Sequence, residues 1–183
     1  MPPDYHMIGM IGVSVRLAVG ITLALAGILK CAKRPDLAPI ARSLGVPLGS
    51  WFSSVVPLLA AVEIILGGWL IVGGWSQIAL AATLVLLTTF TIVLITTSRR
   101  GYRGACACFG ALDSHQVGAT QHLRNGVLLL GTTFVLVEGL NFEWVNAAVW
   151  EVPKITIPTT FAMLIVASIL YRMSSEIEAF LRR

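Results

Sequence analysis

Two cysteines stand one residue apart in the segment RGACACFGALDSH, residues 103–115. Cys106 and Cys108 have three uses at this spacing: they form a disulfide in a small ring, bind a soft metal, or stay reduced and pack as small apolar side chains. Cys31 is the third cysteine of the chain and could exchange with the pair through a mixed disulfide. Since a disulfide between such near neighbours is strained, it would be oxidising and labile rather than structural.

The residues around the pair favour the redox use. Gly104 and Gly110 flank it, and glycine gives the backbone access to dihedral angles that other residues rarely adopt. Arg99, Arg100 and Arg103 lie just upstream, and nearby positive charge increases the thiolate fraction of a cysteine. Because the thiolate is the form that attacks a disulfide, the segment is a candidate site for thiol–disulfide exchange.

Cys106 and Cys108 could instead bind a metal ion. Thiolates select copper(I), zinc or iron–sulfur centres, and His115 and His122 lie near enough in the sequence to complete a ligand set. Zinc sites usually place two to four residues between their first two cysteines, whereas this pair encloses one. Soft-metal handling, with copper as the ion, therefore stays an alternative.

The rest of the chain predicts a membrane protein. Of its 183 residues 56% are hydrophobic and 12% charged, and the mean hydropathy is +0.84, far more apolar than a soluble domain of this length. We interpret the net charge of +4 as a result of membrane topology and expect no nucleic-acid partner. The expected class is a single all-α transmembrane domain over residues 1–183.

Five apolar runs are candidate spans, because about 20 mainly apolar residues cross a bilayer as a helix. The spans are predicted at residues 8–29, 51–73, 77–98, 123–140 and 155–172. The Cys106–Cys108 segment then lies in the loop between the third and the fourth span.

Lys and Arg are distributed unevenly over the predicted loops. Eleven of the thirteen fall on one side of the membrane: Lys30, Lys33, Arg34, Arg42, Arg99, Arg100, Arg103, Arg124, Arg172, Arg182 and Arg183. Lys154 falls on the other side, and Arg16 lies inside the first span. Since cytoplasmic loops carry the excess of positive charge, we predict an outside N-terminus and a cytoplasmic C-terminus, with all three cysteines near the cytoplasmic face.

Two charged residues, Arg16 and Glu63, fall inside apolar runs. A charge at the bilayer centre costs about 2.5–3.5 kcal/mol even on the lenient insertion scale, so such residues usually face the bundle and pair. Counted from the outer ends of their spans, the two lie at similar depths, which predicts an Arg16–Glu63 contact. This pair is either a structural tie between two helices or a proton-handling site coupled to a quinone.

Small residues in the first two spans predict a close approach of two helices. Glycine and alanine let helix backbones come together in a membrane. The residues concerned are Gly20, Ala24, Gly27, Ala60, Gly67 and Gly68.

Four segments carry a family resemblance: LALAGILKCAKRP at the end of the first span, PLLAAVEIILGGWLIVGG in the second, CACFG in the cysteine loop and LRNGVLLL in the fourth span. In this order they resemble the MauE/DoxX group of redox-associated membrane proteins, and the CACFG block resembles the MauE branch in particular. The matches cover about residues 12–135. The family's cysteine pair commonly encloses a glycine, where this chain has Ala107.

The resemblance implies a fold and a function. It implies a DoxX-like four-helix bundle, here with a fifth C-terminal span, in the bacterial cytoplasmic (inner) membrane. MauE proteins support the maturation of methylamine dehydrogenase, an exported enzyme with a disulfide-rich subunit, alongside a thioredoxin-like partner; we do not carry that client over.

The function expected from these residues is thiol–disulfide exchange, which would make the chain an oxidoreductase. Cys106 and Cys108 would pass electrons between a thioredoxin-like partner or client protein and a quinone, with Cys31 as an auxiliary thiol. The alternatives are a non-catalytic subunit or assembly factor that contacts other membrane subunits, and soft-metal handling.

Overall fold

The computed structural model describes residues 3–32, 35–101, 119–141 and 160. Every regular element in these ranges is helical: α1 (Pro3–Ala32), α2 (Ala38–Ser43), the 3-10 helix η1 (Ser50–Ser54), α3 (Val55–Val72), α4 (Ser76–Arg99) and α5 (Ala119–Asn141). The all-α prediction is confirmed for this part of the chain.

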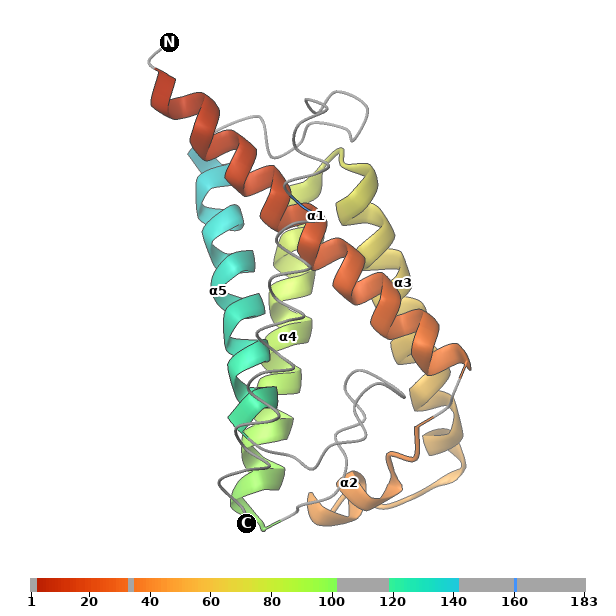
Figure 1. The fold of residues 1–183 in the computed structure, drawn as a ribbon. Helices are drawn as coiled ribbons and strands as arrows, with labels where there is room; N and C mark the ends of the chain where they lie inside the picture. Colours follow the sequence, from red (N-terminus) through yellow and green to blue (C-terminus); the bar gives the residue numbers. More distant parts are fainter. Residues whose placement is uncertain (1–2, 33–34, 102–118, 142–159, 161–183) are drawn as a thin grey trace.

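Four long helices form a bundle (Figure 1). Helix α1 crosses it obliquely: its N-terminal half lies beside α5 and its C-terminal half runs along α3. Helices α3 and α4 are neighbours, as are α4 and α5. The order around the bundle is therefore α1, α3, α4, α5, which is the arrangement expected of an up-and-down four-helix core.

Three helices of the described ranges are long and apolar enough to cross a membrane: Ile11–Ala32, Phe52–Val72 and Ser76–Arg99. They contain most of the first three predicted spans. The fourth predicted span, 123–140, lies in α5, which is of similar length but begins with the polar sequence ATQHLRN. The fifth, 155–172, lies outside the described residues apart from residue 160, so a count of four spans plus one stays a prediction.

A tight turn fixes α3 against α4. Gly73, Gly74 and Trp75 have φ angles of 90°, 70° and 49°, in the left-handed region that glycine adopts without strain. The indole Nε1 of Trp69 donates a hydrogen bond of 2.8 Å to the carbonyl oxygen of Gly74. Because the turn is so short, α3 and α4 must run antiparallel.

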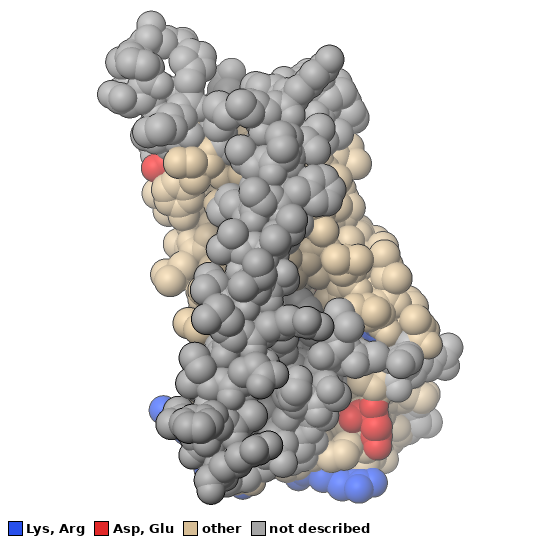
Figure 2. Space-filling model, in the orientation of Figure 1, with Lys and Arg blue, Asp and Glu red and all other residues tan. Residues whose placement is uncertain are grey.

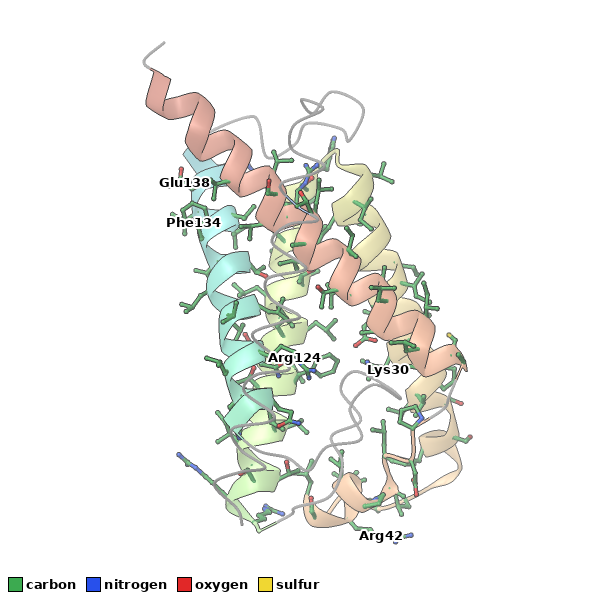
Figure 3. All side chains as sticks on the ribbon, in the orientation of Figure 1. Lys30, Arg42, Arg124, Phe134 and Glu138 are labelled. Atoms are coloured by element: carbon green, nitrogen blue, oxygen red, sulfur yellow. The ribbon has the colours of Figure 1, made fainter. Side chains whose placement is uncertain are left out.

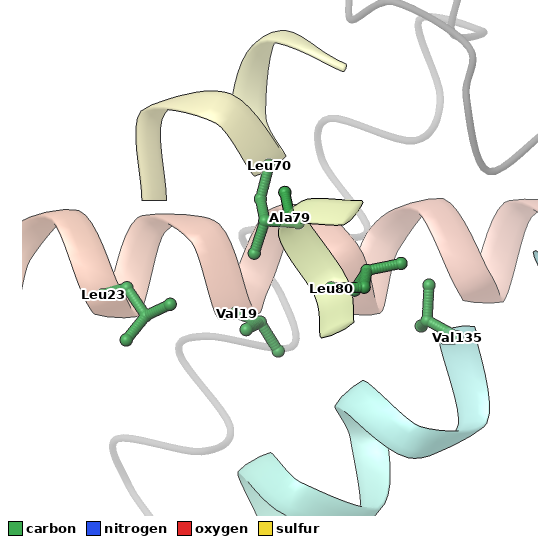
Figure 4. Packing of buried hydrophobic residues seen from close by; sticks show 6 residues of the cluster. All are labelled: Val19, Leu23, Leu70, Ala79, Leu80 and Val135. Carbon is green, nitrogen blue, oxygen red and sulfur yellow. The ribbon is translucent and has the colours of Figure 1, made fainter. Parts of the chain in front are cut away.

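The core of the bundle lies where all four long helices meet (Figure 4). Six buried side chains form the cluster: Val19, Leu23, Leu70, Ala79, Leu80 and Val135. The large apolar side chains on the outward faces are exposed, among them Leu58, Ile65, Val85 and Leu130. Apolar residues on both faces are what a lipid-facing bundle requires.

Helices α1 and α3 approach closely at their glycines, as predicted. A Cβ atom on Gly67 would lie 2.6 Å from the backbone nitrogen of Ala24 and 2.6 Å from the carbonyl oxygen of Gly20. A Cβ on Gly27 would lie 2.7 Å from the carbonyl oxygen of Ala60. The prediction is wrong for Gly68, because a Cβ there would meet nothing within 4 Å.

Candidate functional site

The face of α1 that packs on α3 carries a charged residue near each end. Arg16, Gly20, Leu23, Gly27 and Lys30 are spaced alternately four and three residues apart, so they share one side of the helix. The glycines of this face let α3 come close. Both Arg16 and Lys30 are buried, with 0% and 1% of their surface exposed.

Lys30 forms a buried ion pair with Glu63. Its Nζ atom lies 2.6 Å from Oε1 and 2.6 Å from Oε2 of the Glu63 carboxylate, and both side chains are 1% exposed. Gly27 lies against Ala60 and Ile64 of the antiparallel helix α3. Lys30 lies one turn further along α1, and its long side chain extends back toward the N-terminus of that helix to reach Glu63. Nζ also lies 5.7 Å from the centre of the Phe90 ring, within the range of a cation–π interaction. The pair thus joins α1 and α3 and reaches α4.

The predicted Arg16–Glu63 contact is wrong in its partners. Both residues are buried, but Arg16 Nη1 donates a 3.2 Å hydrogen bond to Oγ of Ser76, and the two Glu63 oxygens accept from Lys30. Depths counted from the ends of the apolar runs misplaced the helices, since Gly20 lies against Gly67 and Leu70. In this register Arg16 lies beyond the end of α3, about 21 Å along α1 from Lys30.

Lys30 is the site residue that sequence reasoning missed. It was counted among the cytoplasmic loop charges, whereas it lies inside α1 and is buried. A lysine at the end of an apolar run usually extends its ammonium group to the interface, so its position in the sequence does not indicate a buried partner. The available signal was its spacing from Gly20 and Gly27, which places it on the packed face of the helix.

Helix α5 also presents polar side chains to the interior. Gln121, Asn125 and Thr132 share a face with Val135, and Val135 packs in the core. Asn125 is 1% exposed, and neither its side-chain oxygen nor its side-chain nitrogen has a hydrogen-bond partner in the described part of the chain. Burying an amide group in this way costs about 1–3 kcal/mol. It is the kind of group that a ligand would satisfy.

The register of α4 and α5 places Asn125 near the Lys30–Glu63 pair. Gln77 of α4 donates a hydrogen bond to the carbonyl oxygen of Gly139 on α5, and the two helices run antiparallel. Counting from that bond along both helices puts Asn125 within about one residue of the level of Phe90. Figure 3 shows Lys30 and Arg124 at this level, with both side chains directed between the helices.

Of the three cysteines, the structure describes Cys31. It lies at the end of α1 with an exposed, free thiol. Cys106 and Cys108 fall outside the described residues, as does His115, so their pairing stays a prediction. Within the described ranges no three His, Cys, Asp or Glu residues are grouped as a metal would need.

The chain that follows Cys31 and the end of α4 meet at one end of the bundle. The chain after α1 forms α2, and Arg100 Nη1, at the end of α4, donates a 2.7 Å hydrogen bond to the carbonyl oxygen of Ser43. Arg42, Arg99 and Arg100 are exposed there. Figure 2 shows basic residues at the lower end of the molecule. The end of α4 at Arg100, which precedes Cys106 by six residues in the sequence, is therefore held against the chain that follows Cys31.

Residues 8–138 match the family described as methylamine utilisation protein MauE. This chain belongs to the MauE family. The match covers more than two thirds of the chain and includes Cys31, Glu63, Cys106, Cys108 and Asn125. The MauE part of the predicted resemblance is confirmed; its DoxX part stays a prediction.

Membership and structure together identify a membrane protein, since the MauE match contains all three described helices that could cross a bilayer. No curated protein and no solved structure matches the chain.

Proposed function

We propose that this MauE-family protein is a membrane thiol–disulfide oxidoreductase that acts in the maturation of an exported protein. The observation that carries the proposal is the family match over residues 8–138, which includes all three cysteines. The name of the family connects it with methylamine utilisation. The client of this chain is left open.

The reaction is an exchange of two electrons and two protons. A thioredoxin-like partner, or the client itself, presents a dithiol, and one of its thiolates attacks the Cys106–Cys108 disulfide to form a mixed disulfide. The second thiolate of the partner then displaces the remaining cysteine, so the partner leaves oxidised and the pair is left as a dithiol. A quinone takes the two electrons and two protons, and the Cys106–Cys108 disulfide forms again.

The described end of the bundle suits this chemistry. Cys31 offers an exposed thiol there, ready to resolve a mixed disulfide as an auxiliary group. Arg42, Arg99 and Arg100 are exposed and give the basic end of the bundle its positive charge. Arg99 and Arg100 precede Cys106 closely in the sequence, and nearby positive charge favours the thiolate form of a cysteine. The hydrogen bond between Arg100 and Ser43 joins the end of α4 to the chain that follows Cys31.

We place the protein in the bacterial cytoplasmic membrane as a multi-pass protein. The basic end of the bundle then faces the cytoplasm, as the distribution of Lys and Arg predicts. The cysteine pair then lies on the cytoplasmic side although its client is exported, so either electrons pass across the membrane through the bundle or the cysteine loop dips inward. The quinone is drawn from the bilayer around the helices.

A second candidate function is a non-catalytic subunit or assembly factor. The outward face of α5 favours it: Leu123, Val127, Leu130, Phe134 and Val137 are exposed and alternate four and three residues apart. That spacing forms a continuous seam, which a neighbouring transmembrane helix can cover as well as lipid can.

The test is disulfide exchange by the purified protein in nanodiscs. Reduced thioredoxin is added, and the redox state of each cysteine is read by maleimide labelling and mass spectrometry. We expect the parent chain to oxidise thioredoxin until its disulfide is consumed. Cys106→Ser and Cys108→Ser should abolish the reaction, while Cys31→Ser should slow it.

The controls separate the alternatives. A parent chain whose Cys106 and Cys108 label fully before reduction, and which leaves thioredoxin reduced, contradicts the proposal and favours the subunit function. Stoichiometric copper or zinc, lost in the two serine variants, would instead establish soft-metal handling.

A further inference from the structure

Lys30 of α1 lies against Glu63 of α3 and Phe90 of α4 inside the bundle. The register of α4 and α5 places Asn125 within about one residue of the level of Phe90. We call these four residues the polar junction. We propose that the polar junction binds the ring of a membrane quinone, the electron acceptor of the thiol exchange. The inference rests on the proposed function for its chemistry and on the geometry of the junction for its place.

Asn125 is the residue that points to a ligand. A buried side-chain amide nearly always has hydrogen-bond partners in a folded protein. Among the residues that the structure describes, Asn125 has none for its oxygen or its nitrogen, although it is 1% exposed and lies on the interior face of α5. A quinone carbonyl accepts a hydrogen bond from the amide nitrogen, and the hydroxyl of the quinol donates one to the amide oxygen.

The other members of the junction suit a neutral aromatic ligand. Lys30 and Glu63 neutralise each other through two 2.6 Å contacts, so the pair attracts no ion strongly. Phe90 adds an aromatic ring, against which a planar ring packs favourably. Arg124 lies at the same level in Figure 3, and its positive charge favours electron density on the quinone oxygens as they are reduced.

The position also suits a ligand with an apolar tail. The junction lies among helices whose outer surfaces are apolar, with Leu58, Ile65, Ile92 and Leu123 exposed around this half of the bundle. A lipid-soluble ligand can therefore keep its tail in the bilayer while its ring binds between the helices.

The reaction at this site balances with the thiol step. The dithiol of Cys106 and Cys108 loses two S–H bonds and gains one S–S bond. The two electrons and two protons released convert the two carbonyl groups of the quinone to the hydroxyl groups of the quinol. Cys31 follows Lys30 directly in α1, so a thiol of this chain lies one residue from the junction.

The experiment measures quinone binding by a chain in which all three cysteines are replaced by serine. Its binding is then independent of whether the thiols react. Decyl-ubiquinone is titrated into nanodiscs and binding is followed by quenching of tryptophan fluorescence. Decylbenzene, which has the tail without the carbonyl groups, is the ligand control.

We expect saturable binding of decyl-ubiquinone and none of decylbenzene. Asn125→Leu should weaken binding about tenfold, because the ligand loses its hydrogen bonds in a buried site. The same variant should unfold at an equal or higher temperature without quinone, because it removes an unsatisfied amide. Thr132→Val, a polar-to-apolar change two turns along the same face, should leave the affinity unchanged.

Phe90→Leu is the second variant and should weaken binding about threefold by removing the aromatic contact. Equal affinity in Asn125→Leu or in Phe90→Leu would overturn the inference. Equal binding of decylbenzene would also overturn the inference, because it would show that the apolar tail accounts for binding without the carbonyl groups. The two claims can fail separately. If the cysteine-free chain binds quinone but the thiols of the parent chain do not cycle, the quinone site stands and the proposed thiol–disulfide function is wrong.

Discussion

The ammonium group of Lys30 lies 2.6 Å from both carboxylate oxygens of Glu63, in the close contact between α1 and α3. Neither side chain is more than 1% exposed. In a bundle surrounded by lipid, an unpaired charge at this place would be costly, so each residue depends on the other. The pair fixes the register of the two helices at the same end of the bundle as Cys31.

Breaking this ion pair should destabilise the protein strongly. Lys30→Met leaves the Glu63 carboxylate buried without its counter-charge, and the expected loss is about 3–5 kcal/mol of unfolding free energy. The double variant Lys30→Met/Glu63→Leu removes both charges and should recover most of that loss. The measurement is unfolding of the purified protein by titration with sodium dodecyl sulfate, followed by circular dichroism.

The matched control for the ion pair is Arg99→Met, which removes an exposed basic residue at the end of α4. It should change the unfolding free energy by less than about 0.5 kcal/mol. A double variant as unstable as Lys30→Met would refute the pairing as the reason for the loss.

Two adjacent glycines should respond very differently to alanine. A Cβ on Gly67 would lie 2.6 Å from backbone atoms of Gly20 and Ala24, so Gly67→Ala must push α1 away from α3. We expect a loss of about 1–3 kcal/mol for Gly67→Ala. Gly68→Ala meets nothing within 4 Å and should be neutral or slightly stabilising, since alanine is the better helix former. Equal effects of the two variants in the same unfolding titration would rule out the close contact.

The hydrogen bond from Arg100 to Ser43 should hold α2 against the end of α4. Arg100→Ala removes the 2.7 Å bond. The amide hydrogens of α2 should then exchange about fivefold faster, which corresponds to the net free energy of one ordinary hydrogen bond. Hydrogen exchange read by mass spectrometry over residues 38–44 measures this. Arg99→Ala is the control and should leave the exchange rates of α2 unchanged.

Much of the fold could be predicted from the apolar runs. Their length and the glycine-rich faces predict membrane helices and the close contact of α1 with α3, because lipid forces all backbone hydrogen bonds into helices. The register could not be predicted in the same way. An apolar run shows where a helix lies in the sequence, but α1 begins at Pro3, before its apolar run, and its packing depth is set by Gly20, Gly27 and Gly67.

The candidate site shows the same limit. Glu63 is recognisable because a carboxylate in the middle of an apolar run needs a partner. Its partner depends on the register, which is why Arg16 was predicted where Lys30 is found. Asn125 carried no signal of burial, because an asparagine near a helix N-terminus is common at the water interface. Its unsatisfied amide becomes visible only once α5 is placed against α4.

Sided thiol labelling in spheroplasts tests the central claim, that the cysteine pair cycles between disulfide and dithiol. A membrane-impermeant and a permeant maleimide are compared before and after reduction, and the labelled cysteines are located by mass spectrometry. Cys31, with its free and exposed thiol, should label without reductant and serves as the internal reference.

We predict that Cys106 and Cys108 label only after reduction, and only with the permeant reagent, because the basic end of the bundle faces the cytoplasm. Full labelling of the pair without reductant would contradict the account, and labelling by the impermeant reagent would contradict the orientation.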